Sequence, residues 1–299
     1  MSRRKLRAVT PRTIATRDGR SLTLYEGGDA GGLAVIVHHG SPSSGLLYER
    51  WFDHAAANGI RLVGFDRSGY AGSTRHRGRS VSTAASDVEA IADVLSLERF
   101  ATWGISGGGP HALACAALCG DRLTAAASVA GVAPWGAEGL DWLAGMGEGN
   151  VTEFGAVLEG EDALRPLLDR ERAAMLAAGP EELTGVLGSL LGDADRAVLF
   201  GGIAAWMDAA HRNGLRDSAD GWLDDDLAFV APWGFEPGAV TRPVLIVQGG
   251  DDRFVPRSHG EWLATNVPGA DAWIDDADGH LTLIERRISD VHGWLLAHS

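Results

Sequence analysis

WGISGGGP, residues 103–110, places one serine among four glycines, directly after an apolar run and directly before an alanine-rich one. Residues 104–108 fit the pattern Gly-x-Ser-x-Gly. The run RFATWGI (99–105) predicts a strand that enters this stretch, and GPHALACAALCG (109–120) predicts a helix that leaves it. Glycines suit such a strand-to-helix turn because the neighbouring backbones come close enough to exclude Cβ atoms.

Ser106 is the candidate nucleophile of this turn. Its hydroxyl would project above the edge of the sheet, and the N-terminus of the helix offers an unpaired backbone N–H group to a developing oxyanion. The chain contains 41 glycines, so the five-residue pattern alone also fits a glycine-rich turn without chemistry. Because a strand and a helix flank the pattern, we predict a catalytic role for Ser106.

The rest of the chain predicts an α/β class of fold. Apolar runs alternate with amphipathic segments, which is typical of a mostly parallel sheet with helices on both faces. An antiparallel hairpin at 12–27 precedes the predicted strands, which are 33–39, 60–66, 99–105, 123–131, 242–250 and 270–276. A last helix is predicted near 284–297. From 134 to 237 we find helix-like stretches and no convincing strand, so we predict an α/β core, 1–133 and 238–299, interrupted by a helical insertion, 134–237.

A serine hydroxyl needs a base that takes its proton, and the chain has ten histidines. His280 follows the last predicted strand in DDADGHLTL (275–283), where loops at the carboxyl ends of parallel strands face one crevice. We therefore predict His280 as the base. His111 lies five residues after Ser106 on the same predicted helix, and we expect it to pack in the core.

The third member of such a site is a carboxylate that orients the imidazole. VLIVQGGDDRFVP (244–256) supplies Asp252, our prediction, and Asp251, the reserve, at the end of the preceding strand. Asp275, Asp276 and Asp278 lie nearer to His280 in sequence, but we expect them to be solvated turn residues.

Composition limits the classes of partner. The chain has 299 residues, 45% of them hydrophobic and 22% charged, and a formal net charge of -14, which argues against binding to nucleic acid or to anionic membranes. The basic start, MSRRKLRAVTPRT, lacks the apolar stretch of a secretory signal and is expected to be a solvated tail. No segment reaches the ~18 apolar residues of a membrane span. We predict a cytoplasmic protein with a small-molecule substrate, and leave its oligomeric state open.

No cofactor or metal site is predicted. Cys115 and Cys119, the only cysteines, are four residues apart on a predicted helix, where they share one face as small core residues. Neither fits a zinc pattern.

The order Ser106, Asp252, His280 is that of the α/β-hydrolase fold, and four segments resemble this family. They are HHGSPSS (38–44), GFDRSGYAGST (64–74), GGDDRFVP (249–256) and DGHLTL (278–283). The resemblance implies a mostly parallel eight-stranded sheet, with the helical insertion in the position of the family's lid.

The resemblance also implies an oxyanion hole formed by the backbone N–H groups of Ser41 and Gly107, with Pro42 shaping the loop. His38 and His39 are expected to be structural residues beside it. The segment 66–73 departs from the family pattern, since it has serine at 68 where proline is usual, and we expect it to support the oxyanion loop without doing chemistry.

A serine nucleophile excludes the dehalogenase and epoxide hydrolase branches, which use aspartate at that position. We therefore predict a serine hydrolase that cleaves an ester, or a related acyl bond, of a small apolar substrate through an acyl-enzyme. Five tryptophans of the insertion fit either an apolar roof over the pocket or plain helix packing.

Other activities stay open. A prolyl-iminopeptidase-like aminopeptidase is the nearest alternative, because those enzymes use lid acids to hold a substrate amine. The acidic stretches at 159–172 and 220–229 could supply such acids, but we expect them to be mostly surface charge. Related enzymes open lactones, cleave carbon–carbon bonds or transfer acyl groups to other acceptors, and a non-catalytic receptor that keeps the triad is the alternative of another class.

Overall fold

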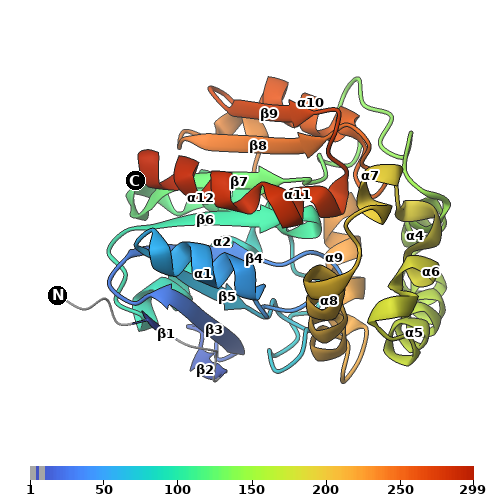
Figure 1. Cartoon of the computed structure of the whole chain (residues 1–299), viewed down its shortest axis with the longest axis horizontal. Helices are drawn as coiled ribbons and strands as arrows, with labels where there is room; N and C mark the ends of the chain where they lie inside the picture. The colour runs from blue at the N-terminus through green and yellow to red at the C-terminus, as the bar shows by residue number, and fades with distance from the viewer. Residues whose placement is uncertain (1–4, 7–10) are drawn as a thin grey trace.

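The computed structural model describes residues 5–6 and 11–299, so most of the predicted solvated tail, 1–13, lies outside the described residues. Residues 5–6 and 12–13 of that stretch form strands, which corrects the expectation for them. The central layer of the structure is a sheet in which eight strands follow the path β1-β3-β5-β4-β6-β7-β8-β9, and β2 pairs with β3 beside it (Figure 1). The strands are β1 (Lys5–Leu6), β2 (Arg12–Ala15), β3 (Ser21–Asp29), β4 (Leu33–His38), β5 (Ile60–Phe65), β6 (Phe100–Ile105), β7 (Leu123–Val129), β8 (Val244–Gly249) and β9 (Asp271–Asp275). The predicted fold class is confirmed.

Along the path β5-β4-β6-β7-β8-β9, neighbouring strands pair in parallel. In contrast, β1, β2 and β5 each pair with β3 in the antiparallel sense. Helices cover both faces, and this is why the central strands are mostly apolar: every residue of β6, β7 and β8 is buried. α1 (Glu49–Ala57) and α12 (Ile288–Ala297) lie on one face, and α2 (Thr83–Val94), α3 (Gly109–Leu118) and α10 (Arg257–Asn266) lie on the other.

The last predicted helix is in fact two helices, α11 (His280–Arg286) and α12. His280 is therefore the first residue of a helix and does not lie in a loop before it. The sequence pattern placed the start too late because the first turn of α11 is held by a carboxylate that is distant in sequence, that of Asp195.

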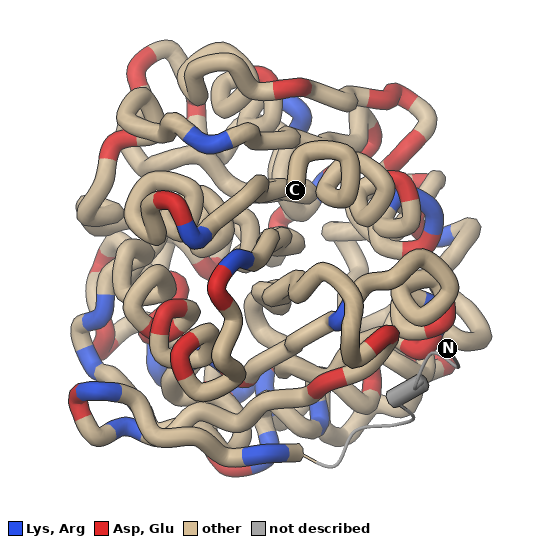
Figure 2. Tube along the Cα trace, turned by 90° about the vertical axis from the view of Figure 1, so that its left-hand side faces the viewer, with Lys and Arg blue, Asp and Glu red and all other residues tan. Residues whose placement is uncertain are grey.

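Between β7 and β8 the described chain contains helices and no strand, as predicted for 134–237, which we call the helical segment. Its α-helices are α4 (Glu148–Glu159), α5 (Glu161–Ala177), α6 (Leu183–Leu187), α7 (Asp193–Arg196), α8 (Gly201–Gly214) and α9 (Asp220–Val230). Figure 1 shows them grouped beyond one end of the strands, in yellow to orange. Figure 2 shows acidic and basic residues interspersed around the trace. None of the described helices has both the length and the apolar character needed to cross a bilayer.

Candidate active site

Ser106 stands on a strained turn directly after β6. Its φ of 54° lies in the left-handed region, where a residue other than glycine costs roughly 1–2 kcal/mol. The flanking glycines leave the space that the turn needs, because a Cβ on Gly104 would lie 2.0 Å from the carbonyl oxygen of Gly108. A Cβ on Gly108 would lie 2.2 Å from the carbonyl oxygen of His38. The surrounding backbone therefore leaves no room for a Cβ atom at either glycine.

His280 and Asp252 meet through a hydrogen bond. The imidazole Nδ1 lies 2.8 Å from Asp252 Oδ2, and both residues are buried. Asp252 Oδ1 in turn accepts the backbone N–H groups of Phe254 and Val255, at 2.9 and 2.8 Å. The ring of Phe254 stacks on the imidazole with centroids 4.4 Å apart. The acid is thus fixed by its own turn and holds Nδ1, which leaves Nε2 as the nitrogen that can exchange a proton.

The structure brings Asp252, and not the reserve Asp251, to His280. Asp251 Oδ2 accepts the backbone N–H of Ala194 in the helical segment, at 3.1 Å. Asp278, expected to be a solvated turn residue, is instead buried and paired with Arg287 at 2.6 Å. That expectation was wrong because the arginine that covers Asp278 lies on the turn between α11 and α12.

Opposing effects set the pKa of His280. Burial alone lowers it, but the negative charges of Asp252 and Asp195 outweigh burial, so the pKa is raised above its ordinary value. The arrangement therefore stabilises the imidazolium that forms when the base takes a proton.

The predicted oxyanion loop lies against the serine turn. A Cβ on Gly107 would lie 2.5 Å from Ser41 Oγ, and a Cβ on Gly40 would lie 3.4 Å from the Cβ of Ser106. His111 is buried, as expected, and its Nδ1 lies 2.7 Å from the carbonyl oxygen of Gly107, so an Nδ1–H tautomer donates to that carbonyl. The two predicted oxyanion residues, Ser41 and Gly107, are thus in contact beside Ser106.

A carboxylate of the helical segment holds the oxyanion loop. Asp225 on α9 is fully buried and accepts hydrogen bonds from Ser41 Oγ at 2.5 Å and Tyr70 Oη at 2.8 Å. The guanidinium groups of Arg67 and Arg79 each donate to it at 2.6 Å. Burial opposes ionisation of Asp225, but the two arginines prevail and hold its pKa well below the ordinary value.

These contacts correct the expectation that the acidic stretch 220–229 is mostly surface charge. Asp224, Asp225 and Asp226 are all buried, because α9 packs between the core and the rest of the helical segment. The expected supporting role of segment 66–73 agrees with the structure, since Arg67 also donates to the carbonyl oxygens of His39 and Gly40.

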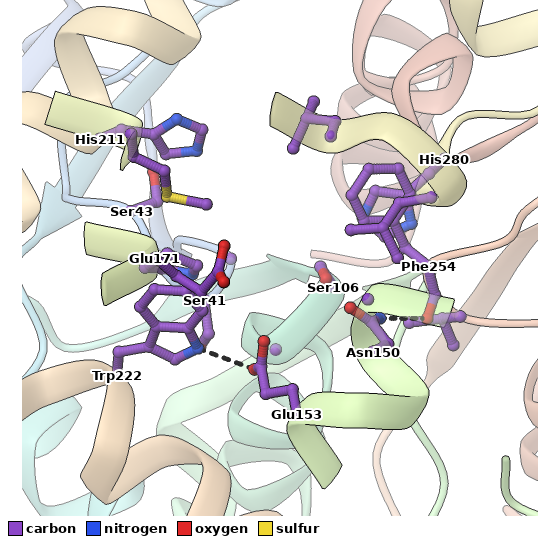
Figure 3. A pocket seen from close by; sticks show the side chains of 18 of the residues that line it. Ser41, Ser43, Ser106, Asn150, Glu153, Glu171, His211, Trp222, Phe254 and His280 are labelled. Carbon is purple, nitrogen blue, oxygen red and sulfur yellow. Dashed lines mark hydrogen bonds between the residues drawn. The ribbon is translucent and has the colours of Figure 1, made fainter. Parts of the chain in front are cut away.

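A cavity of about 460 Å³ contains Ser106, His280, Ser41 and Gly107 in its wall. Figure 3 shows Ser106 between Ser41 on one side and His280 with Phe254 on the other. Helices of the helical segment close the rest of the wall with apolar residues and nearly as many polar ones. The apolar residues include Phe154, Leu167, Met175, Trp206, Met207, Trp222 and Phe229. Trp206 and Trp222 thus line the cavity, as expected of an apolar roof. Trp142 instead packs on Phe154 and donates to the carbonyl oxygen of Ala133.

The cavity wall also contains two carboxyl groups in contact, those of Glu153 on α4 and Asp226 on α9. Trp222 Nε1 donates to Glu153 Oε1 at 2.9 Å (Figure 3), while Asp226 Oδ2 is buried without a hydrogen-bond partner among the described residues. Although part of the Glu153 side chain is exposed, burial of its carboxyl group raises the pKa to about 7. Burial and the neighbouring carboxyl also raise the pKa of Asp226. Burial and the like charge of the neighbour therefore favour protonation of this pair.

Sequence reasoning missed Glu153, Asp226, Asp225 and Asp195, which all lie in the helical segment. The density of acids in DGWLDDDLAF (220–229) was the available signal, because three consecutive aspartates cannot all face solvent from one helix. Among the described residues, no cluster of three or more histidine, cysteine or acidic side chains could hold a metal ion. Cys115 and Cys119 are free and buried, as expected of core residues.

Comparison with known proteins gives a family and several relatives. A family model described as "alpha/beta hydrolase fold" matches residues 34–287. A non-heme chloroperoxidase of Streptomyces lividans is 27% identical over 248 residues, which cover 82% of this chain and 83% of the relative. An esterase of Exiguobacterium antarcticum is similar in structure, with a TM-score of 0.67, 19% identity and coverage of 96% and 99% of the two chains. The enol-lactonase of Burkholderia xenovorans has the same TM-score and identity, with coverage of 96% and 100%.

Proposed function

Since the chain belongs to the α/β-hydrolase fold family, we propose that it is a serine hydrolase that cleaves carboxylic esters of small substrates through an acyl-enzyme. The observation that carries the proposal is the contact of 2.8 Å between Asp252 Oδ2 and Nδ1 of His280, a residue that lines the same cavity as Ser106. The esterase and enol-lactonase among the structural neighbours share this fold and agree with acyl chemistry.

In the first half of the proposed reaction, Ser106 Oγ attacks the ester carbonyl carbon while Nε2 of His280 takes the hydroxyl proton. The electron pair of the carbonyl moves to its oxygen, and the backbone N–H groups of Ser41 and Gly107 donate to that oxyanion. When the tetrahedral intermediate collapses, the bond to the leaving oxygen breaks, and His280 returns the proton to the departing alcohol.

In the second half, water attacks the acyl carbon of the Ser106 ester and gives its proton to His280. Collapse of this second intermediate breaks the acyl–Oγ bond and frees the acid, and His280 returns the proton to Oγ, which restores the Ser106 hydroxyl. The charge on Asp252 stabilises the imidazolium in both halves. The helical segment acts as a lid, because its side chains form most of the wall opposite the serine turn.

A second candidate is an aminopeptidase, in which the scissile bond is an amide next to a free amine. The Glu153–Asp226 pair favours it, because an ammonium group would find a negative charge and the unpartnered Asp226 Oδ2 in the same cavity as Ser106. Glu148 and Glu171 also line this cavity, and so does Arg170.

Turnover measurements test both candidates. Wild type and Ser106→Ala would be compared on p-nitrophenyl esters of increasing acyl length and on aminoacyl p-nitroanilides. A fluorophosphonate adduct on Ser106, located by mass spectrometry, would report the nucleophile independently of the natural substrate. Ester turnover that Ser106→Ala abolishes supports the first candidate, and preference for the anilides supports the second. Wild-type turnover no higher than that of Ser106→Ala on every substrate, without an adduct, would favour a non-catalytic receptor.

A further inference from the structure

The first turn of α11, which begins with His280, is held by a residue of the helical segment. Asp195 Oδ2 accepts the backbone N–H of His280 at 2.9 Å, and Asp195 Oδ1 accepts those of Leu281 and Thr282 at 2.7 and 3.1 Å. The residue before the helix, Gly279, has no side chain that could cap it. One carboxylate, 85 positions away from His280, therefore satisfies three donors that helix geometry leaves free.

The sequence around this contact fits Asp195 closely. A Cβ on Gly279 would lie 2.6 Å from Asp195 Oδ1, so glycine is the residue that lets the carboxylate approach the backbone. The N–H of Gly279 itself donates to Thr282 Oγ1 at 2.6 Å, so the donors of the turn are all used. Asp195 is fully buried, and burial raises its pKa above the ordinary value, although His280 and the backbone N–H donors favour its charged form.

A second contact runs in the opposite direction, from the loop after β8, which carries Asp252, to the helical segment. Asp251 Oδ2 accepts the backbone N–H of Ala194 at 3.1 Å, and a Cβ on Gly192 would lie 2.4 Å from that oxygen. The N–H of Asp251 donates to the carbonyl oxygen of Asp278 at 3.0 Å. The turn 192–195 is thus tied to both loops that carry the acid and the base, and Figure 1 shows α7 beside the start of α11.

We propose that Asp195 is a positioning residue: it fixes the first turn of α11, and with it the imidazole of His280, to the turn 192–195 of the helical segment. The proposal rests on the role of His280 as the base in the proposed function. Asp251 supports the same contact, because it accepts the backbone N–H of Ala194, next to Asp195 in α7.

The pKa of His280 is a quantity that a purely structural contact would leave unchanged. The charged groups that act on His280 are Asp252, from the loop after β8, and Asp195, from α7. Both favour the imidazolium, so loss of the Asp195 charge lowers the pKa of His280. The base then stays deprotonated to lower pH, and the acidic limb of the kcat/KM profile moves to lower pH.

The test uses Asp195→Asn, with Asp193→Asn as the matched control, because Asp193 is an exposed aspartate in the same short helix. In Asp195→Asn an NH2 group replaces one of the two acceptor oxygens, so at least one of the three backbone N–H donors faces another donor. We expect kcat on a p-nitrophenyl ester to fall about 10- to 100-fold, with KM nearly unchanged, because small displacements of a catalytic group have this effect. The control is expected to behave as wild type.

Titration of His280 by NMR provides a readout that does not require turnover. The resonance would be assigned by its absence in His280→Gln, and its titration compared among wild type, Asp195→Asn and Asp193→Asn. A lower pKa of His280 in Asp195→Asn, with no change in Asp193→Asn, supports the proposal. This result stands even if no ester is hydrolysed and the proposed function fails. An unchanged titration together with the kcat of the control would overturn it and leave Asp195 as a structural helix contact. If Asp195→Asn does not fold, Asp195→Ser, which keeps one acceptor without the charge, undergoes the same titration.

Discussion

Ser41 Oγ and Asp225 Oδ2 lie 2.5 Å apart, although 184 positions separate the two residues. The contact joins the predicted oxyanion loop to helix α9 at a point where two arginines already neutralise the carboxylate. The position of Ser41, the proposed donor to the oxyanion, therefore depends on a residue outside the α/β core.

Asp225→Asn is expected to lower both activity and stability. Loss of one partner from a buried ionic cluster costs about 3–5 kcal/mol, because Arg67 and Arg79 stay buried with less compensation. Displacement of Ser41 should also reduce kcat more than it raises KM. Thermal unfolding and steady-state kinetics check this, with the exposed Asp217→Asn as control. A variant with normal kcat and normal unfolding would contradict this account of Asp225.

The two adjacent aspartates of the acid loop should differ in effect. Asp252→Asn is expected to reduce kcat by roughly 10³- to 10⁴-fold, because the amide cannot hold the correct imidazole tautomer. Asp251→Asn touches no reacting group, and weakens only the contact to Ala194, so a much smaller loss is expected. Single-turnover kinetics on an activated ester compares them, and equal losses would mean that the acid is wrongly assigned.

Stability should report the raised pKa of Glu153. Its carboxyl group ionises near 4.5 in the unfolded chain and near 7 in the folded protein, so the folded state binds more protons between these values. The free energy of unfolding contributed by this group therefore falls as pH rises through that window. Denaturant unfolding of wild type and Glu153→Gln at several pH values checks this. The difference between the two proteins should change in this window, and a constant difference would show that Glu153 does not titrate there.

The glycines of the serine turn should be intolerant of a methyl group. Gly108→Ala is expected to unfold or lose activity, because its Cβ would overlap the carbonyl oxygen of His38. Gly155→Ala, in the interior of α4 with no atom near its added Cβ, should instead be neutral or stabilising by up to about 1 kcal/mol. Thermal denaturation of the pair distinguishes close packing from a general sensitivity to glycine replacement.

Most of the strands, and the chain order of the candidate site residues, could be predicted from local sequence. The apolar runs that became β4 to β8 were recognisable because parallel strands inside a sheet are buried on both faces, whereas β9 is an exposed edge strand. Ser106 was recognisable from the glycines on either side of it, since their added Cβ atoms would strike neighbouring backbone. The sequence could not place the start of α11, because its first turn is held by a carboxylate 85 positions away from His280.

By itself the sequence determined the strands, the turn at Ser106 and the chain order of the serine, the acid and the base, since each depends on neighbouring residues and backbone geometry. Only the tertiary structure decided which acids are buried and what they hold: Asp225 the oxyanion loop, Asp195 the start of α11, and Glu153 with Asp226 the cavity wall. The physical reason is that a carboxylate leaves water only where donors or positive charges replace it. In this chain those partners come from segments far apart in the sequence.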